Sequence, residues 1–171
     1  MSAPVTAAIA LGSNLDDPRE QVRRDFEEIA RIPSTRLAAR SRLYRTAPVG
    51  IARQPDFVNA CARVETTLGP RELLEALLAI ERRHGRVRTV PNGPRTLDLD
   101  LLLYGDAVLE EPGLTLPHPR LHERAFALAP LVDAWPEAVI PGRGRASELL
   151  GELDRGGVSE LERPVPKEGT P

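Results

Sequence analysis

Two amphipathic stretches, each opened by a proline, constrain the fold of this chain more than any other feature. The first begins at Pro18 and ends at Pro33, and the second begins at Pro70 and ends near residues 84–85, since proline suits the first helical turn and proline or glycine ends a helix. Apolar residues recur at helical spacing in both stretches, so each presents one face to a core: Val22, Phe26 and Ile29 in the first, and Leu73, Leu77 and Ile80 in the second.

Four stretches with strand character surround these helices. Residues 5–12 are a short apolar run, 34–45 and 56–68 alternate, and the apolar part of 93–105 follows the second helix. The resulting order, βαββαβ, predicts an α+β sandwich of the ferredoxin-like type. In the third stretch we expect two faces, with Val58, Ala60, Ala62 and Val64 toward the core and Phe57, Asn59 and Cys61 opposite.

The C-terminal part predicts an extension of short elements. We expect a small hairpin over 105–117, a partly helical stretch over 120–135 interrupted by Pro130, and a short helix over 146–154. From Arg155 onward the chain is polar and rich in proline and glycine, which is typical of a flexible tail. The sequence therefore predicts one domain over 1–154 and a tail over 155–171.

Composition excludes several classes of protein. The 171 residues carry a formal net charge of −2, which gives no overall reason to expect a nucleic acid or a membrane as partner. No apolar run is long enough to span a bilayer, and the N-terminus lacks the basic start of a signal peptide. Cys61 is the only cysteine, so no internal disulfide can form, and we expect it to be a buried small apolar side chain. These features favour a cytoplasmic monomer.

Asp98 and Asp100 lie within the apolar strand, in the stretch GPRTLDLDLLLYG over 93–105. Residues two apart on a strand point the same way, so both carboxylates face one side while Leu97, Leu99 and Leu101 face the other. Such a pair can hold hard divalent cations, and Mg²⁺ takes one or two protein carboxylates together with substrate phosphates. The alternative is a solvent-facing sheet surface on which both aspartates pair with arginines.

An arginine-rich segment directly before this strand favours the metal interpretation. Guanidinium groups bind phosphate oxygens in a bidentate manner, so a loop of this kind can clamp a polyphosphate, although such loops are more often solvated surface. The sequence has neither a P-loop nor a dinucleotide fingerprint. The arginines concerned are Arg82, Arg83, Arg86, Arg88 and Arg95.

At this point the chain resembles the 6-hydroxymethyl-7,8-dihydropterin pyrophosphokinase family of folate biosynthesis. The resemblance covers about residues 5–150, and the pairing of GPRTLDLD with a downstream PHPR is its most specific part. It implies an enzyme that transfers the terminal diphosphate of ATP to the pterin hydroxymethyl group and releases AMP. The stretches that carry it are LGSNLDDP (11–18), YRTAPVG (44–50), QPDFVNA (54–60), GRVR (85–88), GPRTLDLDLLLYG (93–105) and LPHPRLHERAF (116–126).

The resemblance also implies roles for individual residues. Asp98 and Asp100 would hold two Mg²⁺ ions on the ATP triphosphate, and Arg86, Arg88 and Arg95 would assist the transfer. The pterin would stack on Phe57 and Phe126 and hydrogen-bond to the Asn59 side chain and to main-chain groups of Thr46 and Val49. The implied ATP contacts are Glu81, Arg86, Arg88, Arg95, Leu101, Thr115, His118 and Arg124.

The chain departs from the family pattern in one functional loop. Some members carry a lysine and a tryptophan between GRVR and GPR, whereas here TVPNGPR is one residue shorter, with Thr89 and Asn92 instead. Ala47 replaces a common proline, and Gly113 stands where some members have arginine. We expect these differences to alter rate or loop closure more than reaction type.

Three other interpretations remain open for this sequence. His118 and His122 have the spacing of a zinc pair, but no third ligand follows and Pro119 lies between them. A nucleotide-sugar transferase also uses an Asp-x-Asp metal site, although this chain is short for one. A ferredoxin-like RNA-binding module needs aromatic residues and basic charge on its open sheet face, where this chain has Asp98 and Asp100.

Overall fold

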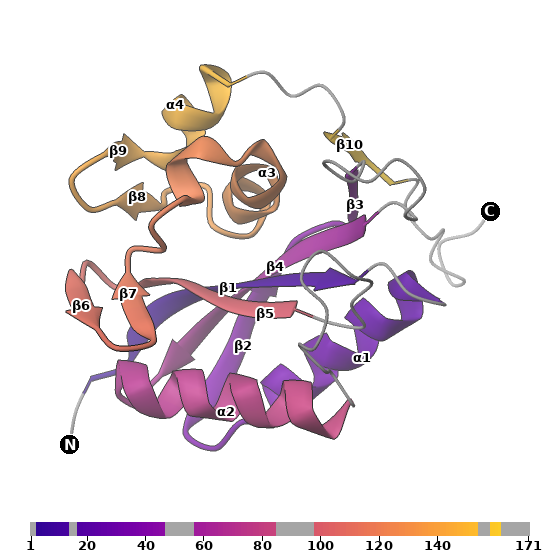
Figure 1. Ribbon diagram of the computed structural model, residues 1–171, viewed down its shortest axis with the longest axis vertical. Helices are drawn as coiled ribbons and strands as arrows, with labels where there is room; N and C mark the ends of the chain where they lie inside the picture. Colours follow the sequence, from indigo (N-terminus) through magenta and orange to yellow (C-terminus); the bar gives the residue numbers. More distant parts are fainter. Residues whose placement is uncertain (1–2, 14–16, 47–56, 85–97, 154–157, 162–171) are drawn as a thin grey trace.

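The computed structural model describes residues 3–13, 17–46, 57–84, 98–153 and 158–161. The first part of the chain has the predicted βαββαβ order, with the second strand divided in two (Figure 1). Its elements are β1 (Val5–Ser13), α1 (Pro18–Ala30), β2 (Thr35–Arg40), β3 (Tyr44–Thr46), β4 (Phe57–Thr66), α2 (Pro70–Arg83) and β5 (Asp98–Tyr104).

The C-terminal part adds short elements around one helix. It consists of β6 (Leu109–Glu111), β7 (Leu114–Leu116), the 3₁₀ turn η1 (Leu121–Glu123), α3 (Ala125–Ala134), β8 (Val139–Ile140), β9 (Gly144–Arg145), α4 (Ala146–Gly151) and β10 (Val158–Glu160). The predicted hairpin is confirmed as β6–β7, and the predicted helix over 146–154 is confirmed as α4. The expected interruption at Pro130 is wrong, because Pro130 lies buried inside α3. A proline there removes a single main-chain hydrogen bond, and burial of the surrounding apolar residues holds the helix together.

A six-stranded antiparallel sheet forms the centre of the molecule. Its strand order is β10-β3-β4-β1-β5, and β2 pairs with β4 as well. The single strand predicted over 34–45 is divided, because β2 pairs with the C-terminal half of β4 and β3 with its N-terminal end. Ser41 bridges the break, since its hydroxyl oxygen accepts the Cys61 N–H at 2.8 Å and its own N–H donates to the Cys61 carbonyl at 2.9 Å.

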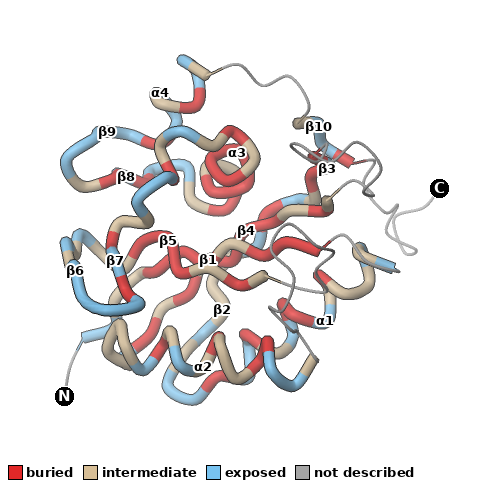
Figure 2. The backbone as a smooth tube through the Cα atoms, in the orientation of Figure 1, coloured by how far each residue is buried: buried red, intermediate tan, exposed pale blue. Residues whose placement is uncertain are grey.

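Helices cover both faces of the sheet. Figure 1 shows α1 and α2 on one side and α3 and α4 on the other, and Figure 2 shows that buried residues concentrate in β1, β4, β5 and α3. The predicted faces of β4 are confirmed, because Val58 and Val64 pack toward α1 and α2 whereas Cys61 packs toward α3. Cys61 is fully buried, and burial raises the pKa of its thiol to about 12, so it is an unreactive core residue.

The strand β10 lies within the segment expected to be a flexible tail. It pairs with β3, and Arg42 forms ion pairs with Glu160 of β10 at 3.1 Å and with Asp133 of α3 at 3.0 Å. Residues 158–161 are therefore part of the folded structure, while the boundary expected at residue 154 stays a prediction. In the part of the chain that the structure describes, no helix is long and apolar enough to cross a membrane.

Candidate functional site

Asp98 and Asp100 occupy the first and third positions of β5. Both are partly buried, whereas Leu99 and Leu101 are 2% and 5% exposed and pack into the core between the sheet and α1 and α2. The expected alternation is therefore confirmed for these residues, and both carboxylates belong to the sheet face that α3 covers in part. Because the neighbouring leucines anchor the strand, the two carboxylates share one face at a spacing fixed by the backbone.

A row of residues across the sheet connects Asp98 with Asn59. Gly12 of β1 is the register partner of Asn59 in β4 on one side and of Asp98 in β5 on the other. Adjacent strands lie about 4.8 Å apart, so the Asn59 and Asp98 main chains are roughly 10 Å apart with Gly12 between them. A Cβ atom on Gly12 would lie only 3.1 Å from Asn59 Nδ2, so the absence of a side chain at Gly12 makes room for the Asn59 amide.

Asn59 is held in one orientation by its neighbour on β3. The Thr46 hydroxyl donates to Asn59 Oδ1 at 2.6 Å, and Thr46 is only 8% exposed. Since the carbonyl oxygen is the acceptor in this bond, the amide nitrogen points to the other side of the group. Phe57, the register partner of Thr46, lies two residues from Asn59 on the same face of β4. The Thr46 side chain therefore fixes the orientation of the Asn59 amide, while the main-chain contact expected from the sequence stays a prediction.

The segment from His118 to Phe126 brings positive charge and an aromatic ring to this region. The Arg124 guanidinium lies 5.5 Å from the centre of the Phe126 ring, within the range of a cation–π interaction. Burial lowers the pKa of Arg124 and so does Arg120, while the charge of Asp100 raises it. The negative charge of Asp100 therefore acts on Arg124, the N-cap residue of α3.

His118 is attached to β5 by its main chain. Its N–H donates to the Leu102 carbonyl at 3.0 Å, and its Nδ1 accepts the Arg120 N–H at 3.3 Å. Burial lowers the pKa of His118, as do the nearby charges of Arg124 and Arg120, so the imidazole is neutral at pH 7 with its hydrogen on Nε2. A neutral donor next to two guanidiniums suits an anionic ligand. Arg120 was not singled out in the sequence, although it belongs to the PHPR motif.

The other expected ATP contacts differ in exposure. Thr115 is exposed on β7, whereas the Leu101 side chain is buried in the core, so Leu101 can reach a ligand only through its main chain. Glu81 is 4% exposed, and its carboxylate accepts the Leu99 N–H at 2.7 Å. The remaining predicted site residues lie outside the described part of the chain: Val49, Arg86, Arg88 and Arg95, together with Thr89 and Asn92 of the altered loop.

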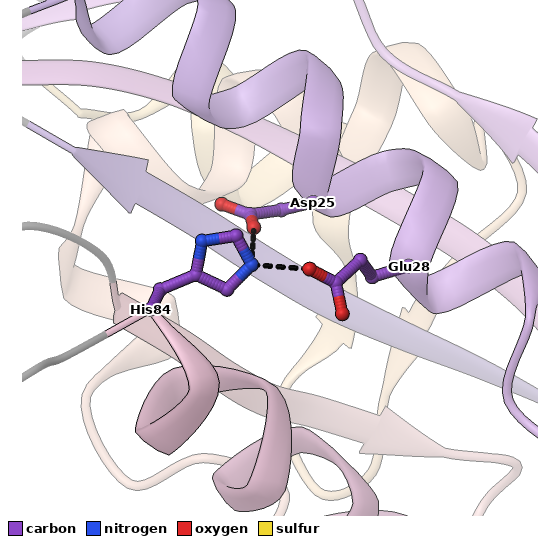
Figure 3. A group of neighbouring side chains, drawn as sticks. All are labelled: Asp25, Glu28 and His84. Carbon is purple, nitrogen blue, oxygen red and sulfur yellow. Dashed lines mark hydrogen bonds and ion pairs between the residues drawn. The ribbon is translucent and has the colours of Figure 1, made fainter.

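Asp25, Glu28 and His84 form a second polar cluster, between α1 and the end of α2 (Figure 3). It is the one group of three potential metal ligands among the described residues, and neither His118 nor His122 belongs to it. Gln21 Nε2 lies 2.9 Å from His84 Nδ1 and 3.3 Å from both Asp25 oxygens. An amide nitrogen only donates, so Nδ1 accepts and the hydrogen lies on Nε2, directed at the Glu28 and Asp25 carboxylates. The cluster is therefore a closed hydrogen-bond network that joins two helices.

This network makes stability depend on pH. Burial raises the pKa of Asp25 from 3.8 to about 6, against the hydrogen bond from Gln21 and the charge of His84. A raised carboxyl pKa means that the folded state binds the proton more tightly, so this contribution to stability is complete below about pH 4 and is lost as the pH rises through about 6. We expect the free energy of unfolding of the wild type to fall by about 1–3 kcal/mol relative to Asp25→Asn over this range.

Denaturant unfolding of both proteins at pH 4.5, 5.5 and 7 measures that difference. Asp106→Asn is the matched control, since Asp106 is exposed in the turn after β5. If the free energy of unfolding changed equally with pH in the wild type and in Asp25→Asn, the result would contradict the expectation.

Sequence comparisons with known proteins match this chain to pterin pyrophosphokinases. A sequence model for 7,8-dihydro-6-hydroxymethylpterin-pyrophosphokinase (HPPK) matches residues 8–136. The 2-amino-4-hydroxy-6-hydroxymethyldihydropteridine pyrophosphokinase of Pseudomonas aeruginosa is 47% identical over 153 residues, which cover 90% of this chain and 94% of the relative. The protein of the same name from Haemophilus influenzae is 43% identical, with coverage of 87% and 93%.

Solved structures share the fold at low sequence identity. The crystal structure of an HPPK-DHPS in complex with substrates matches with a TM-score of 0.71 and 12% identity, covering 88% of this chain and 43% of that one. Wild-type HPPK-DHPS of Plasmodium falciparum with pteroate matches with a TM-score of 0.68 and 13% identity, covering 87% and 42%. This chain thus spans less than half the length of those structures, and the likeness concerns the fold alone.

Proposed function

This chain belongs to the 7,8-dihydro-6-hydroxymethylpterin-pyrophosphokinase family, and we propose that it performs the family reaction with the residues gathered where β1, β4 and β5 meet. It is a pyrophosphokinase that transfers a diphosphate group from ATP to the hydroxymethyl group of 6-hydroxymethyl-7,8-dihydropterin, in folate biosynthesis. The observation that supports the assignment of residues is the row Asn59–Gly12–Asp98, in which an amide and a carboxylate lie on either side of Gly12.

The carboxylates of Asp98 and Asp100 suit magnesium. They are hard oxygen donors on one sheet face, partly buried, and they belong to a strand whose leucines are anchored in the core. We assign two Mg²⁺ ions to this pair, held jointly with the ATP phosphates. When bound, the ions offset the charge that develops on the phosphate oxygens and lower the pKa of a coordinated hydroxyl group.

The other residues of the site bind and orient the two substrates. Asn59 presents its amide nitrogen to the acceptors on the edge of the pterin, and Phe57 and Phe126 supply apolar surface for its flat ring. Arg124 and the neutral His118 bind phosphate oxygens, with Arg86, Arg88 and Arg95 as further contacts. Since no described side chain is needed as a general base, orientation and charge stabilisation supply most of the acceleration.

Thr46 contributes by orienting Asn59. We expect Thr46→Val to raise the KM for the pterin about 5- to 10-fold with little change in the KM for ATP, because the lost hydrogen bond frees the Asn59 amide to rotate. Thr46→Ser keeps the hydroxyl and is the control. Steady-state kinetics with each substrate varied in turn test this, and equal effects of valine and serine would contradict it.

Nucleotide product analysis tests the proposed function. The protein is incubated with ATP, Mg²⁺ and 6-hydroxymethyl-7,8-dihydropterin, and AMP is separated from ADP. We expect AMP that forms only when the pterin is present. Formation of ADP would indicate ordinary phosphoryl transfer, and the absence of any pterin-dependent product would contradict the proposed function.

A further inference from the structure

Glu81 is a buried charged residue that the chemistry of the site leaves unexplained. It lies in the last turn of α2 and is 4% exposed. Burial of a carboxylate is unfavourable unless it is strongly hydrogen-bonded, and the C-terminal end of a helix, with its partial negative charge, opposes a further anion. Two unfavourable terms at one position indicate that a specific interaction compensates for them.

That interaction is the hydrogen bond to the strand that carries Asp98 and Asp100. Glu81 Oε2 accepts the N–H of Leu99, the residue between the two aspartates, at 2.7 Å. The strand β5 ends the sheet, so the side of β5 away from β1 has no partner strand in the described sheet. A carboxylate acceptor makes this a charge-assisted bond, which is stronger than the amide–carbonyl bond a neighbouring strand would provide.

The direction of the main-chain groups in the antiparallel pair β1–β5 shows how the hydrogen bond from Leu99 to Glu81 fixes this part of β5. Main-chain groups of successive residues point alternately toward and away from the partner strand. Since the Leu99 N–H is directed at Glu81, those of Asp98 and Asp100 are directed at Gly12 and Ala10, their register partners on β1. The three residues are therefore held from both sides, by β1 and by α2.

We propose that Glu81 is a positioning residue for the metal site: it holds Leu99 so that the carboxylates of Asp98 and Asp100 meet a divalent cation with its nucleotide at one fixed spacing. This inference rests on the proposed function of the two aspartates. It assigns Glu81 an action through the main chain of β5, in place of the direct ATP contact that the family resemblance implies.

Two conservative variants of Glu81 separate the effect of side-chain length from the effect of charge. Glu81→Gln keeps the length of the side chain and an acceptor oxygen but loses the charge, whereas Glu81→Asp keeps the charge but is one methylene too short for the Leu99 N–H. We expect Glu81→Asp to weaken Mn²⁺ binding about 10-fold or more, and Glu81→Gln to stay within about 3-fold of the wild type. Electron paramagnetic resonance titration of the full chain with Mn²⁺ and a non-hydrolysable ATP analogue measures this without turnover.

Glu72→Ala serves as the matched control for folding. Glu72 also uses a carboxylate to accept a main-chain hydrogen bond, from Gly69 at 2.8 Å, at the opposite end of the same helix. We expect this variant to lower the melting temperature without changing Mn²⁺ affinity. A second readout is hydrogen exchange of the Leu99 amide by NMR, which we expect to be faster in Glu81→Asp and unchanged in Glu81→Gln.

The opposite pattern would overturn the proposal. If Glu81→Asp binds Mn²⁺ like the wild type while Glu81→Gln binds it more weakly, Mn²⁺ affinity depends on the charge of Glu81 and not on the length of its side chain. If both variants bind Mn²⁺ normally but weaken the metal-free ATP analogue, Glu81 contacts the nucleotide directly. Failure of the proposed function would appear elsewhere, as a wild-type protein that binds Mn²⁺ but forms no pterin-dependent AMP.

Discussion

Asp98→Asn and Asp100→Asn are each expected to reduce pterin-dependent AMP formation by about 10³-fold. The physical reason is that an amide oxygen is a neutral, weaker ligand, so each variant loses the charge that the cations need. Loss of about 4 kcal/mol of charge stabilisation in the transition state corresponds to roughly a 10³-fold lower rate. Single-turnover assays with saturating ATP and pterin measure the effect on the chemical step.

Asp106→Asn provides the control for this pair. It removes the same charge from an exposed position in the turn that follows β5, outside the row of residues across the sheet. We expect it to keep wild-type activity and melting temperature. If Asp98→Asn and Asp100→Asn both retained more than a tenth of the wild-type rate, the two aspartates would not be the metal ligands.

The second large effect is expected from Gly12. The Cβ of an alanine would lie 3.1 Å from Asn59 Nδ2, so the amide must move by a few tenths of an ångström, and a valine adds two further methyl groups in the space between Asn59 and Asp98. We expect the KM for the pterin to rise about 10-fold in Gly12→Ala, and kcat/KM to fall about 100-fold in Gly12→Val, since small misplacements of a positioned substrate are costly.

Although Gly12→Ala should bind the pterin more weakly, its stability should not fall. Glycine in a strand is destabilising relative to alanine, so Gly12→Ala should melt at the same temperature as the wild type or slightly higher. Gly151→Ala is the control, because a Cβ there meets no atom within 4 Å. Wild-type kinetics for the pterin in Gly12→Val would show that the pterin does not bind between Asn59 and Asp98.

The proposed metal site is the part of the proposed function that was most accessible from the sequence. A strand imposes a period of two on its side chains, so Asp98 and Asp100 had to share a face once Leu99 and Leu101 were assigned to the core. The two helices could likewise be predicted, because Pro18 and Pro70 mark their starts and their apolar stripes repeat at helical spacing. These are local properties, set by the backbone geometry of a few consecutive residues.

What the sequence could not reveal depends on register and on contacts between distant segments. Gly12 is an ordinary strand glycine until the pairing of β1 with both β4 and β5 places it between Asn59 and Asp98. The sequence alone gives Glu81 only as an ATP contact that the resemblance implies, whereas the packing of α2 against β5 buries its carboxylate and directs it at the Leu99 N–H. The break between β2 and β3 and the return of β10 to the sheet edge likewise arise from pairing partners far away in the chain. Local spacing therefore predicts the candidate ligands of the site, whereas tertiary packing determines which residues can orient them.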